Sequence, residues 1–330
     1  MEKLQELARW LKTNNLNTNL PIELDQLQNL SMLDLSKKKL RELPECIDAL
    51  ENLQILKVSS NRLKKLPNSI GNLKKLKTLQ CENNLLEELP KTIGGLESLV
   101  VLNFNGNRLK SLPKEFYKLK KLTRITIAAN SLEYIDEELK HLDKLLYFSL
   151  DTNYLKELPD VFGDMQSLYY LDLSYNELEE LPESIAQIEE LETLLLEGNN
   201  IHNLPSLQTH DMLIRLNLND NNLNSLDFDI SKLEDLQILT LDNNNLKELP
   251  DNICKLKKLN HLSVSANRLK SLPKSIGDLE NLIELDIEEN YISFLPDSFE
   301  KLSKLKNLYI ANNNNLKKPN IQSLEYCDID

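Results

Sequence analysis

One motif recurs along nearly the whole chain at an almost fixed interval. Its clearest copy runs from Leu53 to Pro67 and reads L-x-x-L-x-[LV]-x-x-N-x-L-x-x-L-P. The first leucine returns every 23 residues, except for one interval of 22 residues between Leu191 and Leu213. Thirteen copies align in this way, with first leucines at Leu30, Leu53, Leu76, Leu99, Leu122, Leu145, Leu168, Leu191, Leu213, Leu236, Leu259, Leu282 and Leu305. Such a period predicts stacked repeats, each of which contacts only its neighbours.

Each copy has two halves with different apolar spacing. The first half, such as Leu168-x-x-Leu171-x-Leu173, alternates apolar and polar residues at its end, which indicates a short strand with one buried face. The second half, L-P-x-x-I-x-x-L, spaces its apolar residues by three or four and begins at proline, which favours a 3₁₀ or short helical turn. One unit cannot bury its own leucines, so neighbouring units must stack.

An asparagine follows the strand in nearly every copy. Its amide can donate to and accept from the backbone of the neighbouring coil, so a ladder of such residues would satisfy buried groups. The predicted ladder comprises Asn61, Asn84, Asn107, Asn130, Asn153, Asn176, Asn199, Asn221, Asn244, Asn267, Asn290 and Asn313. Copy one has Lys38 at this position.

The repeats resemble the leucine-rich repeat family in its 23-residue form, over Leu30 to about Leu316. The pattern is similar to that of Ras-suppressor-type cytoplasmic scaffolds and of bacterial solenoid proteins. The resemblance implies protein–protein recognition, usually through the concave face. Together, repeat and resemblance predict an α/β leucine-rich repeat solenoid: a curved horseshoe with a parallel β-sheet on the concave face and short 3₁₀ or helical turns on the convex face.

The two ends of the chain depart from the repeat. Residues 1–29 are expected to form an N-terminal capping helix and a degenerate half-repeat, residues 30–316 the thirteen repeats, and residues 317–330 a C-terminal cap with a short terminal strand. The helix is predicted from an apolar stripe at i, i+3, i+4 and i+7, and a partner-binding helix is the alternative. The stripe comprises Leu4, Leu7, Ala8, Trp10 and Leu11, and the half-repeat comprises Leu20, Pro21, Leu24 and Leu27.

Charge and cysteine content narrow the function classes. The net charge of −13 argues against a nucleic-acid partner and against an anionic membrane, although a protein partner with a basic patch would suit it. The four cysteines lie far apart without metal-ligand spacing, and the start M-E-K-L-Q-E lacks the features of a signal peptide. We therefore expect a cytoplasmic monomer that has no metal, cofactor or membrane partner.

Three copies are irregular in the half predicted to face outward. Copy five has Ile135-Asp136 where Leu-Pro is expected, copy nine has Leu226-Asp227, and copy eight is one residue short. These departures either bend the solenoid locally, mark a second contact site or reflect neutral drift.

The residues between the strand leucines should point into the concave face. On this face, copies one to five carry an excess of Lys and Arg, whereas copies six to twelve carry an excess of Asp and Glu. Tyrosines gather next to the change of sign, and interfaces favour Tyr and Arg. We therefore predict a partner-binding surface made by Arg124, Tyr147, Tyr170, Asp172, Tyr175 and Leu195. The alternative is that the tyrosines only stack across strands and stabilise the sheet.

Catalysis is not expected. Of the four histidines only His261 falls on the concave face, where Glu284, Ser263 and Asp286 occupy neighbouring positions. No nucleophile elbow or phosphate-binding loop accompanies this grouping. Three non-catalytic functions stay open: an intracellular scaffold or adaptor, a bacterial effector or toxin inhibitor, and the recognition arm of a larger enzyme or receptor.

Overall fold

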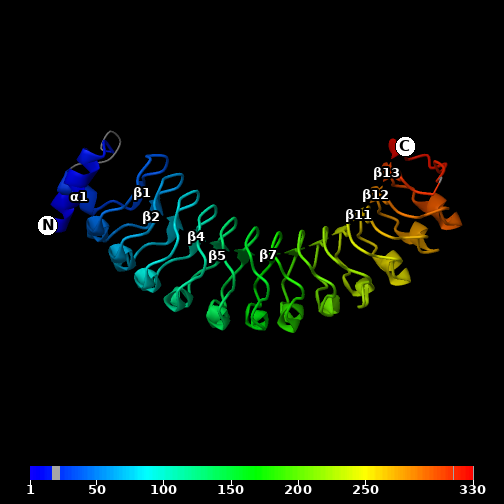
Figure 1. Ribbon diagram of the computed structural model, residues 1–330, viewed down its shortest axis with the longest axis horizontal. Coiled ribbons are helices and arrows are strands. Elements are labelled where there is room, and N and C mark those ends of the chain that lie inside the picture. Colours follow the sequence, from blue (N-terminus) through cyan, green and yellow to red (C-terminus); the bar gives the residue numbers. More distant parts are fainter. Residues whose placement is uncertain (17–22, 315, 330) are drawn as a thin grey trace. The chain divides into compact units, whose positions relative to one another are not determined.

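The computed structural model describes residues 1–16, 23–314 and 316–329. The predicted positions Leu20, Pro21 and Asp330 lie outside these residues. The chain divides into two compact units, Met1–Leu155 and Lys156–Asp330, and each is a stack of coils with strands along one side and short helical turns along the other (Figure 1).

In its described residues, the first unit begins with two α-helices and continues with six coils. Its helices are α1 (Glu2–Thr13) and α2 (Leu24–Gln28), and its strands are β1 (Met32–Asp34), β2 (Ile55–Lys57), β3 (Thr78–Gln80), β4 (Val101–Asn103), β5 (Arg124–Thr126) and β6 (Tyr147–Ser149). The 3₁₀ helices of the first unit are η1 (Glu45–Ala49), η2 (Asn68–Asn72), η3 (Lys91–Gly95), η4 (Lys114–Lys118) and η5 (Glu137–His141).

The second unit repeats the same plan. Its strands are β7 (Tyr170–Asp172), β8 (Thr193–Leu195), β9 (Arg215–Asn217), β10 (Ile238–Thr240), β11 (His261–Ser263), β12 (Glu284–Asp286), β13 (Asn307–Tyr309) and β14 (Tyr326–Asp328). Its 3₁₀ helices are η6 (Phe162–Asp164), η7 (Glu183–Gln187), η8 (Leu207–Thr209), η9 (Ile230–Lys232), η10 (Asp251–Lys255), η11 (Ile276–Asp278) and η12 (Asp297–Lys301).

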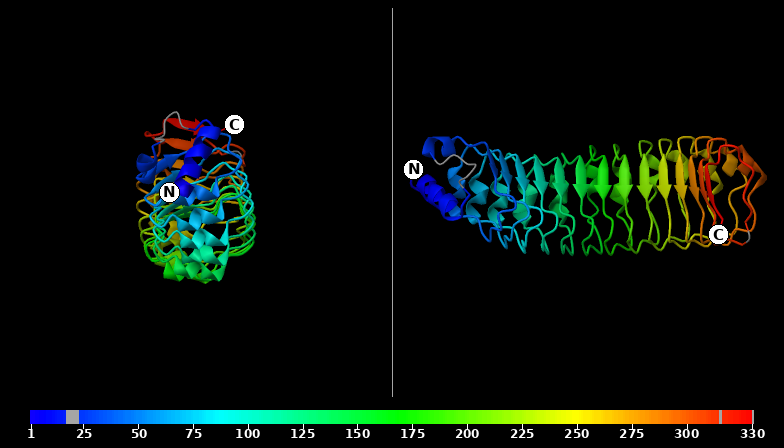
Figure 2. Two further views of the ribbon diagram at one scale, coloured as in Figure 1. Left: turned by 90° about the vertical axis from the view of Figure 1, so that its left-hand side faces the viewer. Right: turned by 90° about the horizontal axis from the view of Figure 1, so that it is seen from above.

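Neighbouring strands pair in parallel within each unit, and the strand arrows lie side by side in Figure 2. The offset is one repeat, so that Leu56 lies opposite Leu79, and Leu79 lies opposite Leu102. These leucines are fully buried, and the strand residues on either side of them point away from the core. The period-2 reading of the strands is therefore confirmed.

The asparagine ladder is confirmed in its hydrogen bonds. Asn84 donates through Nδ2 to the carbonyl oxygens of Val58 in the preceding coil and Cys81 in its own, both at 3.0 Å. Its Oδ1 accepts the backbone N–H of Leu63 at 3.0 Å. One amide thus bonds three buried backbone groups, two of them in the neighbouring coil, and the carbonyls of Val58 and Cys81 each accept a second bond from Asn61 and Asn107 of the ladder.

The outer half of each coil begins as the prolines predict. Pro67 and Pro90 precede η2 and η3 in the extended conformation that a helix start requires. In copy five Asp136 replaces proline, and its carboxylate accepts the backbone N–H of Glu138 at 3.0 Å. In copy nine, Asp229 caps the shortened η9 in the same way by accepting from Ser231. Side-chain capping therefore compensates for the missing proline.

Helix α1 packs its apolar stripe against the first coils, with one correction to the prediction. Leu4, Leu7, Ala8 and Leu11 are buried, but Trp10 is only half-buried. Trp10 lies about 100° around the helix from Leu11, which turns it towards the rim of the buried stripe. An ion pair between Lys3 Nζ and Asp48 Oδ2, at 2.7 Å, joins the helix to η1.

Candidate protein-binding surface

The candidate surface lies on the strand side of the coils. We call this side the strand face and define it as the strand residues whose side chains point away from the core, together with the loop residues that follow each strand. One loop position has a positive φ in nearly every coil, for example Ser60 (56°), Gly106 (64°) and Asn243 (53°). This left-handed turn carries the chain out of each strand, and it suits Gly or Asn better than a bulky residue.

In the first unit, Arg124 and Tyr147 lie together. They face each other across the β5–β6 pair, and the guanidinium carbon of Arg124 lies 3.8 Å from the centre of the Tyr147 ring. This cation–π contact holds a long, exposed side chain over an aromatic ring. The predicted grouping of these two residues is thus present in the structure.

In the second unit, Tyr170, Asp172 and Leu195 share the β7–β8 pair. Asp172 and Leu195 are register partners, and the Tyr170 hydroxyl lies 3.4 Å from Asp172 Oδ2. All three side chains are half-buried. They form a small apolar and acidic patch on the strand face of that unit.

Tyr175 is the most unusual of the predicted residues. It occupies the left-handed loop position with a φ of 53°, yet its side chain is 52% exposed. A non-glycine residue in this conformation costs about 1–2 kcal/mol, and a bulky aromatic residue is uncommon there. Because this positive φ recurs in nearly every coil, the backbone conformation belongs to the repeat, and what distinguishes Tyr175 is its large, exposed aromatic ring.

The next coil holds the Tyr175 side chain in place. Its hydroxyl donates a short hydrogen bond to Glu197 Oε1, and this bond raises the pKa of Tyr175 to about 12. The ring lies over Gly198: a Cβ built on this glycine would be 2.5 Å from a Tyr175 ring carbon. Gly198, with a φ of 68°, therefore provides space as well as a turn.

Glu197 is itself fixed by further strands. Asn217 Nδ2 donates to Glu197 Oε2 at 2.8 Å, and Thr240 Oγ1 donates to Asn217 Oδ1 at 2.8 Å. A chain of hydrogen bonds thus runs from Tyr175 through Glu197 and Asn217 to β10. Such a network reduces the entropy that an exposed side chain would lose on binding a partner.

The sequence prediction missed Gly198, Asn217 and Thr240 as supports of the surface. The available signal was the glycine at the loop position of the coil that follows Tyr175, where most other coils carry a residue with a side chain, such as Ser60 or Asn243. The six predicted residues fall on both units, two on the first and four on the second. Within the first unit Arg124 contacts Tyr147, and within the second unit Tyr170, Asp172 and Leu195 lie on the same pair of strands.

The possible catalytic grouping does not have the geometry of a nucleophile and base. His261 Nδ1 lies 3.4 Å from Glu284 Oε1, as the register of β11 and β12 places it. The hydroxyl of Ser263, however, donates to Asp242 Oδ1 at 2.5 Å and not to the histidine. A serine nucleophile needs the base on its own hydroxyl, and this serine is committed elsewhere.

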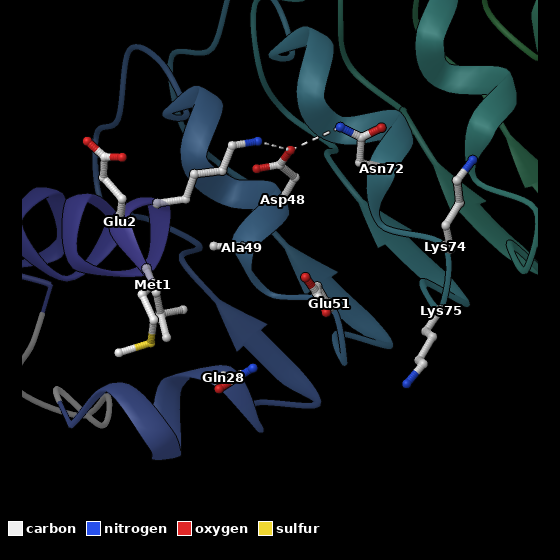
Figure 3. A pocket seen from close by; sticks show the side chains of 11 residues that line it. Met1, Glu2, Gln28, Asp48, Ala49, Glu51, Asn72, Lys74 and Lys75 are labelled. Atoms are coloured by element: carbon white, nitrogen blue, oxygen red, sulfur yellow. Dashed lines mark hydrogen bonds and ion pairs between the residues drawn. The ribbon is translucent and has the colours of Figure 1, made fainter.

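A groove of about 690 Å³ lies at the N-terminal end of the first unit (Figure 3). Asp48 lies at its centre and is only 8% exposed. Its Oδ2 accepts a hydrogen bond from Lys3 Nζ at 2.7 Å and another from Asn72 Nδ2 at 3.0 Å. The residues around it, Glu51, Lys74 and Lys75 among them, differ in charge and do not converge on one point. The groove lies where α1 packs against the first coils.

Neither a metal cluster nor a membrane helix occurs in the described part of the chain. Across residues 1–16, 23–314 and 316–329, no three His, Cys, Asp or Glu side chains are placed to hold a metal ion together. Over the same residues, no helix has the length and apolar character needed to cross a bilayer.

Solved structures with this fold include bacterial and plant proteins. A leucine-rich repeat protein of Leptospira interrogans, LIC12759, is 34% identical with a TM-score of 0.74, covering 90% of this chain and 88% of its own. The plant peptide hormone receptor RGFR1, solved in complex with RGF2, is 27% identical with a TM-score of 0.74. That match covers 93% of this chain but only 57% of the receptor. An internalin of Listeria monocytogenes, InlF, is 17% identical with a TM-score of 0.67, covering 99% and 95%, and shares the fold alone.

Among curated proteins none matches the chain. Family models match most of it. The model described as a leucine-rich repeat region matches residues 1–84, and two models described as leucine rich repeats match residues 74–132, 143–201 and 257–316, and residues 235–256. With these matches and the repeat geometry, the chain belongs to the leucine-rich repeat family.

Proposed function

We propose that this protein is a non-catalytic scaffold or adaptor that binds a protein partner through its strand face. The observation that carries the proposal is Tyr175, an exposed aromatic ring on the strand face that Glu197 and Gly198 hold in position. Preorganised tyrosines are typical anchors of protein interfaces, because they bury a large area while losing little side-chain entropy.

The neighbours support a recognition function for this fold. The plant receptor RGFR1 is a peptide hormone receptor solved in complex with RGF2, so a solenoid similar to this chain serves recognition in that protein. The open strand face of the present chain supplies the outward residues that such recognition needs.

A cytoplasmic location is part of the proposal. Cys46, Cys81 and Cys254 are buried free thiols, and burial raises the pKa of the Cys46 thiol to about 11. Thiols of this kind suit a reducing compartment, where they serve as small apolar core residues.

The test compares two exposed tyrosines that differ in position. Tyr175→Ala removes the proposed anchor, whereas Tyr134→Ala removes a tyrosine of similar exposure (51%) that lies off the strand face. A protein recovered by affinity capture with the wild type would be purified, and its Kd measured for each variant. We expect Tyr175→Ala to weaken binding by about 30-fold or more and Tyr134→Ala by less than about 2-fold.

The proposal fails if both variants bind the recovered partner as tightly as the wild type. It also fails if they weaken binding equally, since the effect would then not depend on the strand face. Circular dichroism and thermal unfolding of both variants check that neither has lost its fold.

A further inference from the structure

A second surface lies on the strand face of the coils that carry β10–β14, away from Tyr175. We call it the C-terminal acidic face. Outward residues of β10–β14 and their following loops contribute five carboxylates and two tyrosines to it: Asp242, Glu284, Asp286, Glu288, Asp328, Tyr309 and Tyr326. None of these side chains is fully buried, so all of them can meet a partner.

The carboxylates lie close enough to repel one another. Desolvation, together with the charges of Asp242 and Glu284, raises the pKa of Asp286 to about 6. Desolvation and the charges of Asp286 and Asp328 likewise raise the pKa of Glu288. His261, which lies 3.4 Å from Glu284, and the backbone N–H of Glu288 act on the pKa of Asp286 in the opposite direction. The face thus has more negative charge than its own cations balance.

An aromatic pair lies among these carboxylates. The rings of Tyr309 and Tyr326 are 5.4 Å apart with planes inclined by 49°, and Tyr326 is 50% exposed. Desolvation, followed by the nearby Glu284, raises the pKa of Tyr309. Aromatic faces beside carboxylates bind ammonium and guanidinium groups, because both the ring quadrupole and the negative charge attract a cation.

The arrangement of these residues favours a cationic protein segment over a metal ion, a nucleic acid or a membrane as the ligand of this face. The carboxylates are spread over β12, β14 and the loops after β10 and β12, and none of the described residues forms a cluster fit for a metal ion. A negative face repels nucleic acids and anionic membranes. What fits is a polymer that brings several separate positive charges to several strands at once.

We propose that the C-terminal acidic face is a docking surface for an extended protein segment that carries lysine or arginine side chains. The inference rests on the proposed function, since it assumes protein recognition by the strand face, but it uses different residues. Neighbouring strands lie about 4.8 Å apart, and alternate side chains of an extended chain about 6.6 Å apart. The carboxylates lie on or directly after every second strand, β10, β12 and β14, which are about 9.6 Å apart, so the long and flexible side chains of lysines at every second position can reach them.

The test uses a labelled peptide of about ten residues that alternates lysine with serine, long enough to cross several strands. A peptide with glutamine in place of each lysine is its neutral control. Binding to the full chain is followed by fluorescence anisotropy against salt concentration. We expect the lysine peptide to bind, with an affinity that falls as salt increases, and the glutamine peptide not to bind.

The key variant is the double substitution Glu284→Gln/Asp286→Asn. Its matched control, Glu234→Gln/Glu248→Gln, removes the same charge from two exposed carboxylates of the same unit that lie outside the strand face. We expect the key variant to weaken peptide binding at least about 10-fold and the control by less than about 2-fold. Equal weakening by both would show attraction to overall charge and would overturn the proposal, as would a peptide that fails to bind the wild type.

A pH series adds a second readout. Lowering the pH from about 7.5 to about 5.5 should weaken binding, because Asp286, whose pKa is raised to about 6, takes up a proton and loses its negative charge. In Asp286→Asn, which keeps His261, Glu284, Asp242 and Asp328, the pH dependence should be shallower. An identical dependence in the two proteins would contradict a direct role for Asp286.

The outcomes also separate this inference from the proposed function. Loss of peptide binding, with Tyr175-dependent partner binding intact, would remove the acidic face and leave the scaffold. If instead the peptide binds the acidic face but Tyr175→Ala leaves partner binding unchanged, the proposed role of Tyr175 is wrong, and the C-terminal acidic face alone serves recognition.

Discussion

At the scale of single residues, the support under Tyr175 makes a specific prediction. Gly198→Ala places a methyl group 2.5 Å from a Tyr175 ring carbon, so the ring must move. Gly106→Ala is the matched control, because Gly106 occupies the same loop position of another coil with a φ of 64° and its nearest atom is Asn83 Oδ1. Both variants should lose about 1–2 kcal/mol of unfolding free energy in chemical denaturation, from the left-handed backbone.

Only the Gly198 variant should affect the partner that depends on Tyr175. We expect its Kd to rise about 10-fold and that of Gly106→Ala to stay within about 2-fold. If both variants bind normally, the position of the Tyr175 ring does not matter for recognition.

His210 makes a prediction about pH. It is fully buried in the shortened copy eight, at a position that holds leucine in most other coils, and neither ring nitrogen has a hydrogen-bond partner within the described residues. Burial lowers its pKa from 6.5, although the backbone of Ile188 and Ile185 and the charge of Asp211 oppose the shift. The folded protein therefore resists protonation at this site.

The sign of the effect follows from the lowered pKa. Above pH 6.5 the histidine is neutral in both states; as the pH falls below 6.5 the unfolded chain takes up the proton first, and stability decreases. His210→Leu should raise the unfolding free energy by about 1–3 kcal/mol and flatten its decrease between about pH 6.5 and pH 5. The exposed His202→Leu is the control, and an unchanged pH profile in His210→Leu would contradict the argument.

The residue scale is also where sequence reasoning succeeded and failed most clearly. The asparagine ladder was predictable, because its chemistry is repeated in every coil and depends only on register. The Tyr175 network was not, since it requires one tyrosine, one glutamate and one glycine to meet from adjacent coils at a single place. The alternation of side chains along each strand predicted which residues point away from the core, but not which of them contact one another.

At the scale of elements, the asparagine ladder predicts a large loss of stability when a single one of its residues is replaced. Asn107 donates to the carbonyls of Cys81 at 3.0 Å and Phe104 at 2.9 Å, and it accepts from the Leu86 N–H at 3.0 Å. Asn107→Leu leaves the Leu86 N–H buried without its partner and removes one of the two asparagine hydrogen bonds to each of the Cys81 and Phe104 carbonyls, so we expect a loss of about 2–4 kcal/mol in urea denaturation. The exposed Asn68→Leu should change stability by less than about 0.5 kcal/mol. Similar losses at both positions would mean that the ladder adds no special stability.

The elements show the same division between local and non-local information. Proline at the start of a coil predicted η2 and η3, because its fixed φ acts locally. Asp136 and Asp229 as replacement caps were missed, since a cap depends on the turn that it begins. Trp10 was placed in the buried stripe for its apolar character alone, and the helix turns it half outward.

At the scale of the whole molecule, stability should be a sum of coils and the interfaces between neighbouring coils. Leu102 is fully buried in β4, and its register partners are Leu79 in β3 and Ile125 in β5. Leu102→Ala should cost about 2–5 kcal/mol locally, through lost burial and the cavity that remains. In amide hydrogen exchange we expect the largest loss of protection in β3–β5 and a much smaller loss in β12 and β13, which belong to the other unit. A uniform loss along the chain would instead show all-or-none unfolding of every coil together, and the additive description would then be wrong for this protein.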